Sequence, residues 1–169
     1  MTNSTFAIYG VSLEVPEDWT VEVNPKSNRQ KCDIAFHMEE GNKFYLSWGV
    51  LNEAQERFKT LDEHVDFSLK QVQKGRDVDS LETVERKDGE VNGHRSIFAR
   101  VSVLVRSGFM GRTATRRVFL STHFYCPETM RFYVVYLLSG SAQVDEESMI
   151  TTYRDVMSSF RCHPTSNPS

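Results

Sequence analysis

The chain has 169 residues, of which 39% are hydrophobic and 25% charged, and its formal net charge is −3. A chain of this length buries roughly two-thirds of its unfolded surface, enough for a core without disulfide or metal support. The nearly balanced charge argues against a nucleic-acid-binding protein. No apolar run approaches the roughly 18 residues that span a bilayer. We therefore expect one globular domain over residues 1–163, followed by a disordered tail at 164–169.

The opening residues, MTNSTFAIY, have neither the basic nor the apolar region of a secretory signal, so we expect a cytoplasmic protein. Cys32, Cys126 and Cys162 lie far apart and show no CxxC spacing. This pattern predicts reduced thiols rather than a disulfide framework. If the mature protein were secreted, a bridge between Cys32 and Cys126 would be the alternative.

Residues 6–22 predict two short strands around a turn. Apolar and polar side chains alternate on both sides of Pro16-Glu17-Asp18, whose composition is typical of a turn. Two more alternating runs, residues 32–38 and 44–51, predict a second pair of strands separated by a polar turn.

A helix is predicted over residues 61–74. Thr60 and Glu63 have the spacing of a capping box, in which each side chain accepts a hydrogen bond from the backbone N–H of the other residue. Apolar residues follow at helical spacing, and Gly75 stands where a helix commonly ends.

Residues 81–87 predict a short strand, followed by tight turns at 87–90 and at Asn92-Gly93. Three long extended runs come next: residues 97–106, 117–125 and 131–139. The last two runs are apolar at both odd and even positions, so we expect central strands that are covered on both faces.

Asp145-Glu146-Glu147 predicts the start of a second helix, because acidic residues stabilise the positive end of the helix dipole. His163-Pro164 is expected to end it. The strands and helices do not alternate as in a parallel α/β protein. The order therefore predicts an α+β fold, with an antiparallel sheet of six or seven strands sandwiched by helices.

Several motifs, taken in order over residues 6–162, resemble the PsbP-like superfamily. They are YGVSLEVPEDW, the capped helix, EVNGHRSIFARV, RRVFLSTHFYC and YRDVMSSF. That superfamily includes the photosystem II protein PsbP, the Ran-binding Mog protein, DcrB-like lipoproteins and Eag chaperones of type VI secretion. The resemblance implies a PsbP-like α/β/α architecture and a role in binding or assembly rather than catalysis. It transfers no site residue.

A basic hairpin is the first candidate site. Residues 94–131 carry seven arginines against Glu128 alone, whereas residues 51–93 carry eleven acidic and seven basic residues. The tip, residues 107–112, places two large apolar residues between glycines, which permit unusual backbone angles. Such a tip suits an acidic partner or an anionic membrane surface. We predict protein binding by Arg100, Arg106, Phe109, Met110, Arg112 and Arg116. Alternatively, the arginines solubilise the strand edges and Phe109 folds back onto the body.

The second candidate is a small-ligand pocket, which could carry a hydrolytic activity, on a polar and aromatic sheet face. Its residues would be Phe98, Arg100, Phe119, His123, Tyr125 and Tyr133. A second core layer, with the Tyr and His tips hydrogen-bonded, is favoured over the pocket, because strands that are apolar on both faces are usually covered.

The third candidate is a metal or thiol site built from His123, Cys126, Cys162 and His163. Zinc needs four converging ligands, and most zinc sites show closer paired spacing, so we predict no metal, no cofactor and no catalytic residue. P-loop, dinucleotide-binding and HExxH motifs are absent from the sequence. We expect a cytoplasmic, non-enzymatic protein-binding module acting as an adaptor, assembly factor or chaperone, with a homodimer through an exposed sheet edge as a further alternative.

Overall fold

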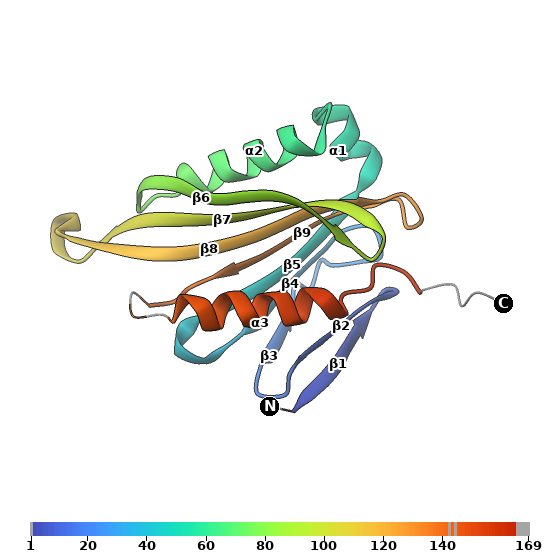
Figure 1. Ribbon diagram of the computed structural model, residues 1–169, viewed down its shortest axis with the longest axis horizontal. Helices are drawn as coiled ribbons and strands as arrows, with labels where there is room; N and C mark the ends of the chain where they lie inside the picture. Colours follow the sequence, from blue (N-terminus) through green and yellow to red (C-terminus); the bar gives the residue numbers. More distant parts are fainter. Residues whose placement is uncertain (1, 142, 144, 165–169) are drawn as a thin grey trace.

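The computed structural model describes residues 2–141, 143 and 145–164, and these residues form three layers (Figure 1). A seven-stranded sheet of order β3-β4-β5-β9-β8-β7-β6 separates helices α1 and α2 from helix α3. A second, two-stranded sheet of β1 and β2 packs beside α3. The strands are β1 (Asn3–Ile8), β2 (Val11–Pro16), β3 (Thr20–Val23), β4 (Cys32–His37), β5 (Lys43–Val50), β6 (Val78–Val91), β7 (His94–Ser107), β8 (Thr113–Cys126) and β9 (Arg131–Leu138). The helices are α1 (Leu51–Arg57), α2 (Leu61–Gln73) and α3 (Glu146–Ser159), with short 3₁₀ turns at Glu39–Gly41 and Phe109–Gly111.

The predicted fold class is confirmed, because every neighbouring pair of strands in the large sheet is antiparallel. The two strands expected to be central, β8 and β9, lie inside the sheet with neighbours on both sides. The opening segment is divided between the two sheets. Strands β1 and β2 turn at Tyr9-Gly10 and pair with each other, whereas β3 forms one edge of the large sheet.

The prediction of a turn at residues 87–90 is wrong. Strand β6 continues through Gly89, which pairs with Ser96, and the hairpin turns only at Asn92-Gly93. Asn92 and Gly93 have φ values of 50° and 85°, as the two central residues of a type I′ turn require. This long hairpin brings His94, at the start of β7, close to Cys162 and His163.

Two further boundaries differ from the sequence expectation. Residues 51–57 form helix α1, where the preceding strand was predicted to extend to Leu51 and no helix was predicted. Helix α3 ends at Ser159 rather than at His163. Beyond it, Arg161 exchanges two backbone hydrogen bonds with Ser12 of β2, which pulls the segment out of the helix. Most of the tail expected at 164–169 lies outside the described residues.

Each face of the large sheet carries its own apolar core. On the α3 face, β2 and α3 pack over β4, β5, β8 and β9, and the hydroxyl of Tyr153 bonds Thr122 Oγ1 at 2.7 Å inside that core. On the other face, Leu61, Val65 and Leu69 of α2 pack on the apolar side of β7. None of the described helices is long and apolar enough to cross a membrane.

Helix α2 covers only part of its sheet face. Thr60 caps its first turn, and the Thr60 hydroxyl accepts a hydrogen bond from the Glu63 N–H at 3.1 Å, as the capping box predicts. The helix contacts β6, β7 and β8 and leaves the neighbouring strands β9 and β5 to α1. The space between the two helices and β9 is the cavity described below.

Candidate functional site: an apolar pocket and a basic hairpin

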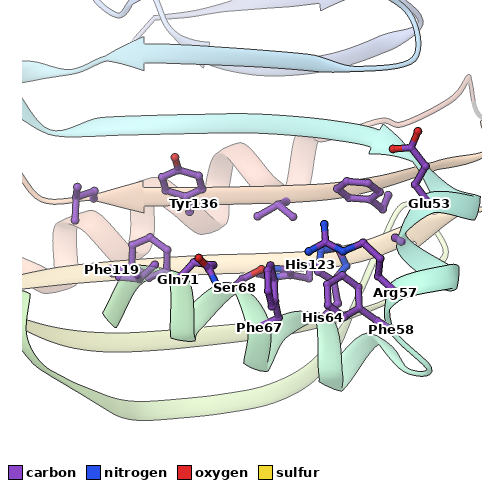
Figure 2. A pocket seen from close by; sticks show the side chains of 15 residues that line it. Glu53, Arg57, Phe58, His64, Phe67, Ser68, Gln71, Phe119, His123 and Tyr136 are labelled. Carbon is purple, nitrogen blue, oxygen red and sulfur yellow. The ribbon is translucent and has the colours of Figure 1, made fainter. Parts of the chain in front are cut away.

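A cavity of about 450 Å³ opens between α1, α2 and the adjoining face of β8 and β9, and we call it the α2 pocket (Figure 2). Its volume falls in the range of small-ligand sites. The residues that line it are mostly apolar, with a few polar groups from the helices: Glu53, Ala54, Arg57, Phe58, His64, Phe67, Ser68, Gln71, Val72, Phe119, His123, Phe132, Val134, Tyr136 and Leu138.

Aromatic rings form much of the pocket wall. The rings of Phe58 and His64 stack with centroids 4.4 Å apart, and the Arg57 guanidinium lies over Phe58 and Phe67 at 5.2 and 4.9 Å from their centroids. On the strand side, Gly49 makes room for Phe132, since a Cβ at Gly49 would stand 2.5 Å from a carbon of that ring. The wall is therefore a tightly fitted aromatic surface with one cation at its rim.

Two buried histidines stand in this wall. His64 Nδ1 lies 3.1 Å from the Tyr125 hydroxyl, and His123 Nε2 lies 2.9 Å from Ser68 Oγ. Burial, aided by the charge of Arg57, lowers the pKa of His64 to about 4. Burial, aided by His64 and Arg86, lowers the pKa of His123 to about 3. Both rings are therefore neutral near pH 7.

Ser68 and His123 have the spacing of a nucleophile and its general base, but His123 is too weak a base to activate the serine. A histidine with a pKa of about 3 is a poor general base near neutral pH. His123 Nδ1 is buried and has no hydrogen-bond partner among the described residues, so no carboxylate orients the ring as in a catalytic triad. The arrangement suits binding of an apolar group better than hydrolysis.

The structure separates the residues predicted to form an aromatic pocket. Phe119 and His123 line the α2 pocket, and Tyr125 lies on the same face, bonded to His64. Phe98 and Tyr133 lie on the opposite face, in the α3 core, where Phe98 packs on Tyr153 and Tyr133 stacks on Phe124. The predicted set thus mixed two faces of one sheet.

The tip of the β7–β8 hairpin extends beyond α2 at one end of the molecule (Figure 1). Phe109 and Met110 at this tip are 83% and 78% exposed, more than any other large apolar side chain among the described residues. Gly108, Met110 and Gly111 have φ values of 82°, 57° and 65°, so the tip turns through left-handed backbone. Phe109 does not fold back onto the body.

The arginines of this hairpin fall into two groups. Arg100 pairs with Glu146 of α3 at 2.5 Å, and Arg106 pairs with Asp79 of β6 at 2.8 Å. Arg112 and Arg116 are exposed, and neither has a carboxylate partner among the described residues. Only these two arginines of the predicted binding set are free to meet another molecule alongside Phe109 and Met110.

The residues considered for a metal site are also divided. His123 faces the α2 pocket, whereas Cys126, Cys162 and His163 come together on the other side of the sheet. His94, which lay outside the predicted set, joins them as a fourth group. All three cysteines are unpaired and buried.

Most of the pocket residues from the helices were not predicted. Arg57 and Phe58 belong to α1 and the residue after it, and that helix was not foreseen. His64, Phe67, Ser68 and Gln71 lie along one side of the predicted α2, so a helical projection of residues 61–74 could have identified them as a second, partly polar face.

Comparison with known proteins shows the fold. No protein-family model matches the sequence, and no curated protein matches it. Among solved structures, Saccharomyces cerevisiae Ran-binding protein Mog1p matches with a TM-score of 0.64 at 10% identity, over 98% of both chains. The cyanobacterial PsbP protein of Synechocystis matches with a TM-score of 0.60 at 13% identity, over 94% of this chain and 91% of that one. A Pseudomonas aeruginosa protein of unknown function matches with a TM-score of 0.54 at 12% identity, over 96% and 99%. The chain has the PsbP-like fold.

Proposed function

We propose that this PsbP-like chain is a non-catalytic protein-binding module that docks an acidic surface of its partner through the tip of the basic hairpin, residues 100–117. The observation that carries the proposal is the tip itself. Phe109 and Met110 are exposed to solvent, next to Arg112 and Arg116, which lack carboxylate partners within the described part of the chain.

This combination matches the known anatomy of protein interfaces. Exposed aromatic and methionine side chains are enriched at interface centres, and arginine is enriched among the residues that dominate binding energy. The two free arginines would attract an acidic partner and orient it, while Phe109 and Met110 would be buried on contact. Arg100 and Arg106 would act indirectly, because their pairs with Glu146 and Asp79 fix the base of the hairpin.

Two observations support binding over catalysis and a protein over other partners. Mog1p, which has the same fold, is a Ran-binding protein. The polar pair in the α2 pocket, Ser68 and His123, lacks an effective base. We place this activity in the cytoplasm, where the three unpaired cysteines would stay reduced.

The proposal is tested by charge reversal at the tip. In a quantitative pull-down from the source cell, Arg112→Glu/Arg116→Glu should lose at least about tenfold of a partner that wild-type protein recovers, since like charges would now face its acidic surface. The matched control is Lys26→Glu/Arg29→Glu, the same change of charge on the exposed loop between β3 and β4.

Circular dichroism and thermal unfolding should show that both double variants remain folded. The partner, once purified, should bind with an affinity that falls as salt is added. Unchanged recovery by the tip variant, or equal loss in both variants, would end the proposal. Light scattering of the purified chain separates partner binding from a homodimer.

A second candidate function is binding of a small apolar ligand, and the α2 pocket favours it. Gln71→Trp would place an indole across the mouth from the exposed side of α2, and Lys70→Trp is its control on the same helix outside the lining. In a thermal-shift screen of metabolites, a compound that stabilises wild type and Lys70→Trp but not Gln71→Trp would identify the ligand. A screen without such a compound would count against this function.

A further inference from the structure

Four side chains able to bind a metal meet where the β6–β7 turn, the end of β8 and the segment after α3 come together (Figure 1). The ligand atoms of His94, Cys126, Cys162 and His163 all lie within 4.8 Å of one another. Cys126 and Cys162 are fully buried, and the His94 side chain is only 11% exposed. Two sulfurs and two imidazole nitrogens are the donor set of a closed structural zinc site.

The spacing between the two rings fits one metal centre. His94 Nε2 and His163 Nε2 lie 3.3 Å apart, with the ring planes inclined at 68°. Two imidazole nitrogens on one tetrahedral zinc ion stand about 3.3 Å apart, and two thiolate sulfurs about 3.8 Å, given the usual zinc–ligand bond lengths. The four donors would move by about an ångström or less to reach these separations.

The sheet register explains why these residues meet. Strand β7 pairs with β8 from Ser96 and Phe124 onward. His94 begins β7 and Cys126 ends β8, each two residues beyond that pair, and their ligand atoms lie within 4.8 Å of each other. The exchange of backbone hydrogen bonds between Arg161 and Ser12 then holds the next two residues of the chain, Cys162 and His163, beside that pair.

Neighbouring groups prepare the ligands in the way that metal sites require. His163 Nδ1 lies 3.0 Å from the Pro164 carbonyl oxygen, which can only accept, so the ring donates from Nδ1 and its Nε2 is free to bind a metal. The Asn92 side-chain amide donates to Cys162 Sγ at 3.2 Å. Glu128 Oε2 lies 3.4 Å from His94 Nε2 and 3.7 Å from Cys126 Sγ. At this position its negative charge would stabilise a bound cation.

We propose that His94, Cys126, Cys162 and His163 bind one zinc ion as a closed structural site. The ion would fasten the segment after α3 to the β6–β7 hairpin and to β8, and so hold α3 on the sheet. This proposal departs from our sequence expectation of no metal site, and it does not depend on the docking function of the hairpin tip.

Cobalt titration of the fully reduced chain tests the site. Wild-type protein should bind one Co²⁺, with the visible spectrum of tetrahedral cobalt and a thiolate charge-transfer band, and zinc should displace it. Metal analysis of protein purified without chelator should find one zinc per chain, and zinc should raise its unfolding temperature. His163→Gln changes a partly exposed ligand near the end of the chain, and Cys126→Ser changes a buried one.

Each ligand variant should lose more than about 100-fold in cobalt affinity, which exceeds the loss from altering a group that only hydrogen-bonds a metal ligand. Cys32→Ser, the matched control at the third buried cysteine, should keep full affinity. Circular dichroism of His163→Gln establishes that its loss is not unfolding. A reduced wild-type chain that stays colourless with cobalt would overturn the proposal. So would unchanged affinity in both ligand variants, or a Cys126–Cys162 disulfide in protein freshly isolated from its native compartment.

Discussion

His123 shows how position on one strand decides what a side chain can do. It is 1% exposed, bonded to Ser68 through one nitrogen and unpartnered within the described residues at the other. Cys126, three positions along β8, points to the opposite face and into the cluster with His94. Alternation of side chains along the strand therefore assigns neighbouring residues to separate sites.

The two pocket histidines should make stability depend on pH. Their pKa values in the folded protein are about 4 for His64 and about 3 for His123, below the ordinary 6.5 that applies when unfolded. Between pH 6.5 and 4 the unfolded chain binds protons that the folded protein does not. The free energy of unfolding should therefore decrease as the pH is lowered through this range, by up to about 1.4 kcal/mol per pH unit for each histidine.

Urea unfolding at several pH values between 7 and 4.5 measures this dependence. His123→Gln keeps a polar side chain but removes one titrating group. The slope of the unfolding free energy against pH should therefore decrease by up to about 1.4 kcal/mol per pH unit, which is the contribution of one proton. Comparing slopes rather than absolute stabilities removes the cost of the substitution itself. Equal slopes in wild type and variant would show that His123 is not a buried neutral histidine.

Helix α2 is the element on which the pocket depends. Its apolar side packs on β7, and its partly polar side, with His64, Ser68 and Gln71, lines the cavity. The Thr60 hydroxyl satisfies the Glu63 N–H, and the Glu63 carboxylate in turn accepts from the Lys59 N–H at 2.8 Å. This reciprocal cap fixes where the helix begins, and so it positions the side chains of α2 that line the pocket.

Removal of this cap should destabilise the protein measurably. Thr60→Ala leaves the Glu63 N–H without its acceptor and should lower the free energy of unfolding by about 1 kcal/mol in urea titration. Thr151→Ala, on the exposed side of α3, is the control and should cost nothing, because alanine is the better helix former. A cost no larger than that of the control would contradict the role of the cap.

The sequence was sufficient for elements whose signal is local. The capping box located α2, apolar alternation located β7, and continuous apolar runs located β8 and β9. The sequence was insufficient wherever the pairing with a neighbouring strand decides which face of the sheet a side chain occupies. Phe98 and Phe119 lie on adjacent strands, and only the register, in which Phe98 pairs with Thr122, shows that they face opposite ways. The closeness of His94 to Cys126 likewise depends on how β7 and β8 align, which their separate sequence patterns do not specify.

At the scale of the whole molecule, the chain is electrically polarised although its net charge is only −3. Carboxylates of α2 and β6 pair with the nearby arginines Arg86, Arg95 and Arg106. The hairpin extends beyond α2, past the Arg106–Asp79 pair at the base of its tip. Its outer part carries Phe109, Met110, Arg112 and Arg116, and neither of these arginines has a carboxylate partner within the described residues. The cavity, the four-residue cluster and the tip are thus three separate features of one PsbP-like fold.

Site-specific photo-crosslinking in the source cell tests the docking surface most directly. A benzophenone amino acid would replace Phe109 at the tip, Tyr9 in the turn between β1 and β2, or Gln71 at the mouth of the α2 pocket. Tyr9 is an exposed aromatic residue and serves as the matched control. The β1–β2 turn that carries it lies at the opposite end of the molecule from the hairpin tip (Figure 1). We expect a single protein adduct at position 109 that is lost in the Arg112→Glu/Arg116→Glu background, and none at position 9. Equal adducts at positions 9 and 109, or an adduct at position 71 alone, would contradict it.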